Sequence, residues 1–435
     1  MGACRRIMME FRLYREGTMS KGLKTTLLVL SFVILAFTVA GALGVKAGTG
    51  DGAYRQMGVY NDVLEHIETY YVETPDLGKV SNGALHGVVE ALDGDSSYMS
   101  SAEYKQYKQM AHPSAGIGAV ISKHFGYGFV ISVIPGGPGD KAGLETGDII
   151  EALEEKSTRE MSLATLTTLL SGPGGTTVNL SVVRASKAQP QKITITRGTA
   201  PTPSLSYKSL ENNEIGYLRP EGFPKGHSQE ISAALHELAA KGAKKIILDL
   251  RNSADGDPAE GVATANLFLD HGEIGYLEGQ MYPRQSFTAD PSKVICKLPL
   301  VVIVNHSTAG AAEILAGAIL DNARGDLLGD KTFGSANVQK TFDLQDGGAL
   351  ILSVAKYHLP TGKAIQDSLV TPNILVADKA EELSQLDENE EENPEAKPEP
   401  KKPQTDEQLR RAIEQLTKPA PVKAADAAAP SKATS

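Results

Sequence analysis

A glycine-framed apolar turn in the first half of the sequence is able to hold a negative group without any charged side chain. The turn consists of Gly116, Ile117, Gly118 and Ala119, and Val120 continues it into a strand-like run. Glycines let the backbone curl so that successive N–H groups can face a carboxylate beside an open strand edge. These five residues are therefore the candidate peptide-binding residues, and the expected ligand is the C-terminus of a peptide or protein.

The sequence around this turn predicts a small domain that spans residues 113–199. Short β-rich runs such as GAVIS, FVISVI and TVNLSVV are separated by the turns PGGPG and SGPGG. One helix interrupts them at about 162–170, because Leu163, Leu166 and Leu170 fall on one face. The stretch VIPGGPGDKAGLETGDIIEAL closely resembles the matching segment of PDZ domains. The resemblance implies a β-barrel-like domain that binds peptide tails.

A helical region and an α/β domain flank this module. At 53–112, apolar residues recur three and four positions apart, which predicts short helices. At 200–378, strand-like runs such as IGYLRP, KKIILDLRN and LVVIVN alternate with helical segments, a pattern typical of α/β domains. The expected fold class is multidomain: an N-terminal helical region, a PDZ β-barrel-like domain and an α/β protease-like core.

The order of these regions, and many blocks within them, resembles the carboxyl-terminal processing proteases, an S41 family of exported serine peptidases. The matching text includes LDGDSSYMSSAEY, IILDLRN, AAEILAGAILDNAR and GGALILSVAKYHLPTGKAI. The resemblance implies a serine–lysine pair, in which a lysine of lowered pKa acts as the base for the serine hydroxyl. The sequence suggests no metal site, and no cofactor is expected.

Both residues of that pair are replaced in this chain. Against the family pattern S-A-S-A-S-E, the text TAGAAE places Gly310 at the nucleophile position. Against F-G-K-G-x-V-Q, the text FGSANVQ places Ser335 at the lysine position, whereas the neighbours Glu313 and Gln339 are retained. Glycine has no side chain with which to attack a carbonyl, so no intact catalytic residue is expected.

A third departure lies in the loop that helps to form the family's oxyanion hole. The family text R-N-N-P-G-G reads RNSADG here, which places Asp255 and Gly256 at the oxyanion-loop positions. A carboxylate at Asp255 opposes a developing oxyanion. Loss of the nucleophile alone costs on the order of 10⁶ in rate in a comparable triad. The three changes predict a pseudoprotease that binds peptide C-termini as an adaptor, regulator or chaperone-like factor.

Two alternatives remain open at this stage. Ser307 or Thr308 with Lys331 could form a displaced pair, which predicts an active endopeptidase that cleaves exported proteins near their C-termini. A nucleophile must lie about 3 Å from its base, so we expect Ser307 to cap a helix instead. His306 and His358 are expected to have structural or solvent-facing roles. The second alternative is a structural envelope protein whose peptide site is vestigial.

The N-terminal residues indicate export. Residues 25–45 carry no charge, and Lys21 and Lys24 precede them, which is typical of a segment inserted with its positive flank inside. The triplet AGA near its end resembles a cleavage site, so a signal anchor and a removed signal peptide remain open. Residues 1–24 are then cytoplasmic, with Met19 as an alternative start. The expected location is the cell envelope, anchored in the inner membrane with most of the protein in the periplasm.

Composition narrows the partners. The 43 basic and 53 acidic residues offer no cationic face for nucleic acid. Cys4 and Cys296 fall on opposite sides of the expected anchor, so no internal disulfide is expected. The segment 379–435 begins as an acidic, proline-rich linker, and its amphipathic stretch at 406–416 either docks back or stays a free helix before a disordered tail. Expected partners are C-terminal tails of exported proteins, an active relative or a second copy, and the membrane.

Overall fold

The computed structural model describes most of the protein beyond the first fifty residues, namely residues 22, 25, 30–32, 50–110, 115–184, 187–377 and 406–418. Most of the expected membrane segment lies outside the described residues, as do Met19, Cys4 and the expected linker and tail. Among the helices that are described, none is long and apolar enough to cross a membrane. Cys296 is a buried free thiol.

The protein forms two compact units, Met1–Val80 and Ser81–Ser435. The helices expected at 53–112 are α2 (Gly50–Tyr70), α3 (Leu77–Glu90), which crosses the boundary between the units, and α4 (Ser101–Gln109). The turn before α4 is fixed by the Glu103 carboxylate, which accepts a 2.8 Å hydrogen bond from the Ser100 N–H. These helices confirm the prediction that this region is helical.

The module expected at 113–199 folds around one six-stranded antiparallel sheet in the order β2-β3-β4-β6-β7, with β5 paired to β4. Val130, Ile150, Leu166 and Leu180 are fully buried in its core. The expected helix is α6, which Ser162 caps by accepting a hydrogen bond from Thr165 N–H. The elements are β2 (Ala119–His124), β3 (Tyr127–Val133), α5 (Pro138–Ala142), β4 (Ile149–Leu153), β5 (Lys156–Ser157), η1 (Thr158–Glu160), α6 (Leu163–Leu170), β6 (Thr177–Arg184) and β7 (Lys187–Thr196).

The α/β domain is built on a second six-stranded sheet, whose order is β19-β16-β15-β11-β9-β8. All its neighbouring strands are parallel except β8 and β9. Its strands are β8 (Leu205–Leu210), β9 (Ile215–Pro220), β11 (Lys245–Asp249), β15 (Leu300–Val304), β16 (Asp326–Gly329) and β19 (Ile374–Leu375). β11 and β15 are buried on both faces, which explains their continuous apolar text.

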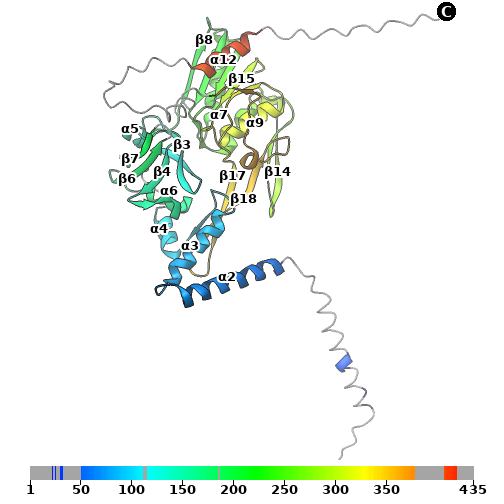
Figure 1. Cartoon of the computed structure of the whole chain (residues 1–435). Coiled ribbons are helices and arrows are strands. Elements are labelled where there is room, and N and C mark those ends of the chain that lie inside the picture. The colour runs from blue at the N-terminus through cyan, green and yellow to red at the C-terminus, as the bar shows by residue number, and fades with distance from the viewer. Residues whose placement is uncertain are drawn as a thin grey trace, which may run out of the picture. The chain divides into compact units, whose positions relative to one another are not determined.

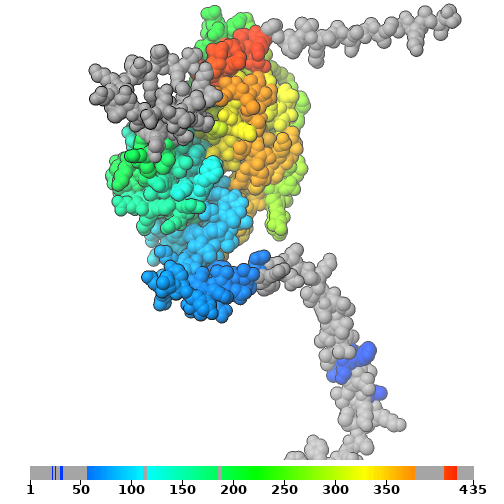
Figure 2. Space-filling model, in the orientation of Figure 1, coloured from blue at the N-terminus to red at the C-terminus, as the bar shows by residue number. Residues whose placement is uncertain are grey.

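Helices cover both faces of this parallel sheet (Figure 1). One face packs against α7 (His227–Ala240), α8 (Pro258–Asn266) and α9 (Ala311–Asp321). The other face, which includes Ile247, Val301 and Ile303, packs against α12 (Glu407–Thr417). The amphipathic stretch near the C-terminus therefore docks back onto the domain, and Figure 2 shows it in red against the body of the molecule.

A smaller antiparallel sheet joins the helical region to the α/β domain. Its order is β1-β18-β13-β14, and β17 also pairs with β18. β1 comes from the text between α3 and α4, and its residues pair with those of β18. The remaining elements are β1 (Ser97–Met99), β10 (Gly222–Phe223), β12 (Asp255–Gly256), β13 (Glu273–Gly279), β14 (Tyr282–Thr288), η2 (Pro291–Lys293), β17 (Asn337–Asp343), β18 (Ala349–His358) and α10 (Ile365–Ser368).

Three loops meet at the carboxyl edge of the parallel sheet. They follow β11, β15 and β16, which are neighbours in the sheet and run in the same direction. In open α/β sheets, this edge is where functional residues gather. The loops hold the three places where the sequence differs from the family motifs that it otherwise resembles: 255–256, 310 and 335.

Candidate active site

Gly310 lies where the backbone turns sharply from β15 into α9. It is the residue before the helix, with φ 60° and ψ −118°, a conformation that residues with side chains rarely adopt. A Cβ built on it would have the carbonyl oxygens of Ser335 and Ala254 as its nearest neighbours, at 3.5 and 3.9 Å. There is therefore room for a side chain, and glycine leaves the position without a nucleophile.

Ser335 lies beside Gly310. This is the place expected for it, because the sequence resemblance aligns Ser335 with the family's catalytic lysine. The 3.5 Å distance joins its carbonyl oxygen to the Cβ site of Gly310, although the two residues come from different loops. Its side chain is a hydroxyl and provides no basic nitrogen that could take a proton from an attacking group. The structure thus brings together the two positions of the expected pair, and both are substituted.

The Glu313 side chain forms hydrogen bonds with both the loop of Gly310 and the loop of Ser335. Its carboxylate is fully buried and accepts hydrogen bonds from the N–H groups of Gly310, Gly334 and Ser335, at 3.0, 2.7 and 2.9 Å. The Thr332 hydroxyl donates a fourth bond. Burial raises the pKa of Glu313 to about 7, against the opposing effect of these donors. The framework that would align a nucleophile and a base is therefore retained around the substituted positions.

Gln339 is bonded to a residue of the helical region. Its side-chain amide donates to the Asp95 carbonyl oxygen at 2.7 Å. The Asp95 carboxylate accepts from Asn337 at 2.5 Å and from Ser122 of β2 at 3.4 Å. Burial raises the pKa of Asp95. One aspartate thus joins the helical region, the sheet of the peptide-binding module and the strand that follows Ser335. Sequence reasoning missed it although the LDGDSSYM block contains it.

The loop after β11 carries the two expected oxyanion-loop residues. Asp255 is exposed, and Gly256 has φ 141°, where a Cβ would lie 2.5 Å from the Phe223 carbonyl oxygen. Only glycine fits at that second position. The carbonyl oxygen of Ala254, an acceptor and not a donor, is the group of this loop nearest to the Cβ site of Gly310.

Of the two alternative hydroxyls, that of Thr308 has structural partners. Thr308 is fully buried, and its Oγ1 donates to the Leu250 carbonyl oxygen at 2.9 Å while accepting from the Asn305 N–H at 3.0 Å. Ser307 is 6% exposed, and Lys331 is exposed to solvent. The expectation that Ser307 caps a helix is wrong: Gly310 precedes α9, and Glu313 supplies the reciprocal bond.

The two histidines contact neighbouring loops and rings. His306 Nε2 lies 3.4 Å from the Asp330 carboxylate, and its Nδ1 lies 3.2 Å from the Lys331 carbonyl oxygen. His358 stacks on Tyr276, with ring centroids 4.7 Å apart. Neither contact joins a histidine to Gly310 or Ser335.

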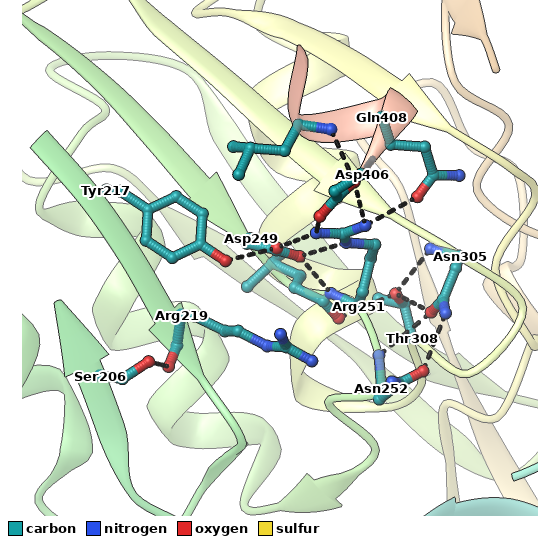
Figure 3. Close-up of polar contacts among 12 residues, drawn as sticks. Ser206, Tyr217, Arg219, Asp249, Arg251, Asn252, Asn305, Thr308, Asp406 and Gln408 are labelled. Atoms are coloured by element: carbon teal, nitrogen blue, oxygen red, sulfur yellow. Dashed lines mark hydrogen bonds and ion pairs between the residues drawn. The ribbon is translucent and has the colours of Figure 1, made fainter. Parts of the chain in front are cut away.

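A polar network links β9, the end of β11 and the start of α12 (Figure 3). The Asp249 carboxylate accepts from the Tyr217 hydroxyl at 2.7 Å and from Arg251 Nε at 2.8 Å. The Arg251 guanidinium also binds both oxygens of Asp406, at 3.0 and 2.7 Å, just before α12. Burial and the neighbouring Asp249 raise the pKa of Tyr217, which keeps it a donor. The docked C-terminal helix is thereby bonded to the residue that begins the oxyanion loop.

The next residue extends this network to the peptide-binding module. The Asn252 N–H donates to the Asn305 side chain at 3.1 Å, and its carbonyl oxygen accepts from Ser132 of β3 at 2.9 Å. Phe129, also on β3, stacks on Phe333 of the loop that holds Ser335, with ring centroids 5.8 Å apart. One strand of the module therefore contacts two of the three loops.

The glycine-framed turn lies at the start of β2, as expected. Gly118 has φ 68°, and a Cβ there would lie 2.8 Å from Pro138 Cδ, so glycine is required. Among the described residues, the N–H groups of Ile117 and Gly118 donate to no other group. Two adjacent free donors at the end of an edge strand are what a carboxylate needs.

Comparison with known proteins agrees with this architecture. The model of peptidase family S41 matches residues 214–376, and that of the PDZ domain matches residues 129–184. The carboxy-terminal processing protease CtpA of Bacillus subtilis is 31% identical, over 82% of this chain and 78% of its own. A carboxyl-terminal-processing protease of Synechocystis is 36% identical, over 57% of this chain and 58% of its own.

A solved structure shares the fold. The photosystem II D1 C-terminal processing protease superposes with a TM-score of 0.60 at 24% identity, over 73% of this chain and 92% of its own. The helical region, PDZ module and α/β domain thus form the architecture of one known family. The chain belongs to the carboxy-terminal processing proteases, with a PDZ domain and an S41 peptidase domain.

Proposed function

We propose that this member of the family is a pseudoprotease that binds the C-terminal tails of other proteins. The observation that carries the proposal is the pair of adjacent positions 310 and 335, which hold glycine and serine. A serine–lysine mechanism needs a hydroxyl at one and an amine at the other. Thr308, the alternative hydroxyl, is fully buried and engaged in two hydrogen bonds, which supports the same view.

The retained parts support recognition without cleavage. Ile117 and Gly118 offer two free N–H donors beside the edge strand β2, so an extended tail can add a strand there. Such a protein acts as an adaptor, regulator or chaperone-like factor, alone, with a second copy or with an active relative. The uncharged segment 25–45 supports export and anchoring in the cell envelope, where exported tails are available.

A restoration experiment tests the catalytic half of this proposal. The purified full-length protein and the variant Gly310→Ser with Ser335→Lys are incubated with an unstructured test protein. We expect the natural protein to be inert, and cleavage by the variant would show that the scaffold still aligns the pair. Cleavage by the natural protein that Ser307→Ala or Thr308→Ala abolishes would overturn the proposal, and a fluorophosphonate probe locates the reactive hydroxyl in that case.

Recognition is tested separately. Fluorescent decapeptides with free C-termini, whose last four positions vary among Ala, Val, Leu and Ser, are titrated with the full-length protein. We expect saturable binding that is lost when the terminal carboxylate is amidated, because the free N–H pair then has no anion to bind. Equal binding of acids and amides would contradict a carboxylate site.

A further inference from the structure

The outer edge of β2 is available to a ligand strand over only part of its length. β2 is the first strand of the PDZ sheet and pairs with β3 alone, so its other side carries unpaired main-chain groups. At its start lie the free N–H groups of Ile117 and Gly118. A tail bound there would run antiparallel to β2, from the His124 end of the strand to its own C-terminal carboxylate at Gly118.

The far end of this edge is already covered by the segment between α3 and β1. The Asp95 carboxylate accepts from the Ser122 hydroxyl at 3.4 Å. A Cβ built on Gly94 would lie 3.0 Å from the Lys123 carbonyl oxygen, so the two backbones are in close contact. We name residues 93–97 the end wall, because they occupy the place where a longer ligand strand would continue.

The end wall and the end of α3 that leads into it are both bonded to the PDZ domain. The Lys123 ammonium of β2 donates a 2.7 Å hydrogen bond to the carbonyl oxygen of Met161, which lies just before α6. It also forms a 2.7 Å ion pair with Glu90 at the end of α3, and its side chain is only 4% exposed. Ser97 accepts a 3.2 Å bond from the Ala164 N–H in the first turn of α6.

The end wall is also fixed on the side of the α/β domain. Asn337 and Gln339 of β17 bond to the carboxylate and carbonyl oxygens of Asp95, at 2.5 and 2.7 Å. Ser96 accepts from the Ser353 N–H of β18 at 3.1 Å. A tail that continued along β2 would have to break these bonds, so the wall is a boundary and not a loose loop.

We propose that the end wall limits this site to about the last four residues of a tail and excludes a longer strand. The free edge runs from Ala119 to Ser122, and each strand residue advances the backbone by about 3.3 Å. The proposal rests on the proposed function, since it assumes that a carboxylate binds at Ile117 and Gly118. After the fourth residue the tail must leave the edge of β2, so folded proteins with short free ends are suitable ligands.

Peptide length is the measurement that tests the limit. The decapeptide that binds the full-length protein best is remade with its last four and last six residues, each as acid and amide. We expect the three acids to bind within about threefold of one another. An acid that gains tenfold or more from four to ten residues overturns the length limit while leaving carboxylate recognition intact. If no acid binds better than its amide, it is the proposed function that fails.

A second variant opens the wall. Lys123→Ala with Asp95→Ala removes the bridge to α6 and the bonds to Ser122 and Asn337, so the decapeptide should gain at least fivefold over the tetrapeptide. Lys156→Ala, which removes an exposed lysine of β5, is the matched control and should leave the ratio at its natural value. An unchanged ratio in a wall variant that still melts cooperatively overturns the proposal, and the series on the natural protein decides alone if the variant does not fold.

Discussion

At the scale of single residues, one buried carboxylate supports the two positions at which we propose that the reacting groups have been lost. Glu313 still accepts four hydrogen bonds that hold the loops of Gly310 and Ser335 together. The backbone conformation at Gly310 is energetically unfavourable for any residue that has a side chain. Glycine avoids that cost.

Gly310→Ser and Gly310→Ala should both lower the free energy of unfolding, by about 1–3 kcal/mol, because φ 60° with ψ −118° is strained for either residue. The space around the Cβ is sufficient, so equal costs identify the backbone as the cause. Urea unfolding of the full-length protein measures the change. Gly83→Ala in α3, where no atom lies within 4 Å, is the control and should be stabilising by about 0.5–1 kcal/mol. A stabilising Gly310→Ala would contradict this account.

Glu313 should make stability depend on pH. Its pKa is raised to about 7 in the folded protein, above the ordinary value of 4.5, so the folded state holds the proton more tightly than the unfolded state. The stabilisation from this group is fully present below pH 4.5 and is lost as pH rises through 7, by about 3 kcal/mol at 1.36 kcal/mol per pKa unit.

Glu313→Gln should remove that slope while lowering stability at pH 5, since the amide replaces one of the two acceptor oxygens by a donor. The measurement is the difference in unfolding free energy between the two proteins at pH 5, 6, 7 and 8. Parallel curves for the two proteins would show that Glu313 does not titrate in this range.

At the scale of elements, α12 completes the α/β domain. Ala412 is fully buried against Ile247, Val301 and Ile303 of the parallel sheet, and Asp406 binds Arg251 at the edge of that sheet. A helix of this length is marginal in water by itself. Its helical state therefore depends on packing and on these polar contacts.

Ala412→Arg should release α12, because the long charged side chain has no room between the helix and the sheet. We expect the amides of residues 407–417 to exchange with deuterium at least tenfold faster, since the freed helix melts. Arg411→Ala changes a half-exposed neighbour on the same helix and should leave exchange unchanged. Slow exchange in the Ala412→Arg variant would show that docking does not hold the helix.

At the scale of the whole molecule, the PDZ domain and the α/β domain share few but specific contacts. Ser132 donates to the Asn252 carbonyl oxygen, Phe129 stacks on Phe333, and Asp95 bonds to both domains. Small interfaces of this kind leave the domains free to unfold separately once they are weakened.

The double variant Ser132→Ala with Phe333→Ala should uncouple the two domains. A hydrogen bond and an aromatic pair contribute about 0.5–1.5 kcal/mol each, so their joint loss is a large part of the coupling. Calorimetry of the full-length protein should then show an earlier, separate unfolding transition. Phe342→Ala, on the exposed side of β17, is the control and should leave the transitions as they are. Coincident transitions in the double variant would place the coupling elsewhere.

The sequence by itself determined many of the elements, and it is the basis for the proposal that positions 310 and 335 have lost the family's reacting groups. Apolar periodicity predicted α6 and α12, continuous apolar runs predicted β11 and β15, and alignment on short motifs predicted that positions 310 and 335 are substituted. These properties depend on local residue types, so they can be read along the sequence.

The tertiary structure alone decided which distant groups meet. Asp95 and Gln339 lie 244 positions apart, and Arg251 and Asp406 lie 155 apart, so no local pattern reveals either bond. The error at Ser307 has the same origin, because the end of the loop and the start of α9 are set by how Gly310 turns above Glu313. The end wall on β2 likewise exists only because three regions of the protein fold onto one strand edge.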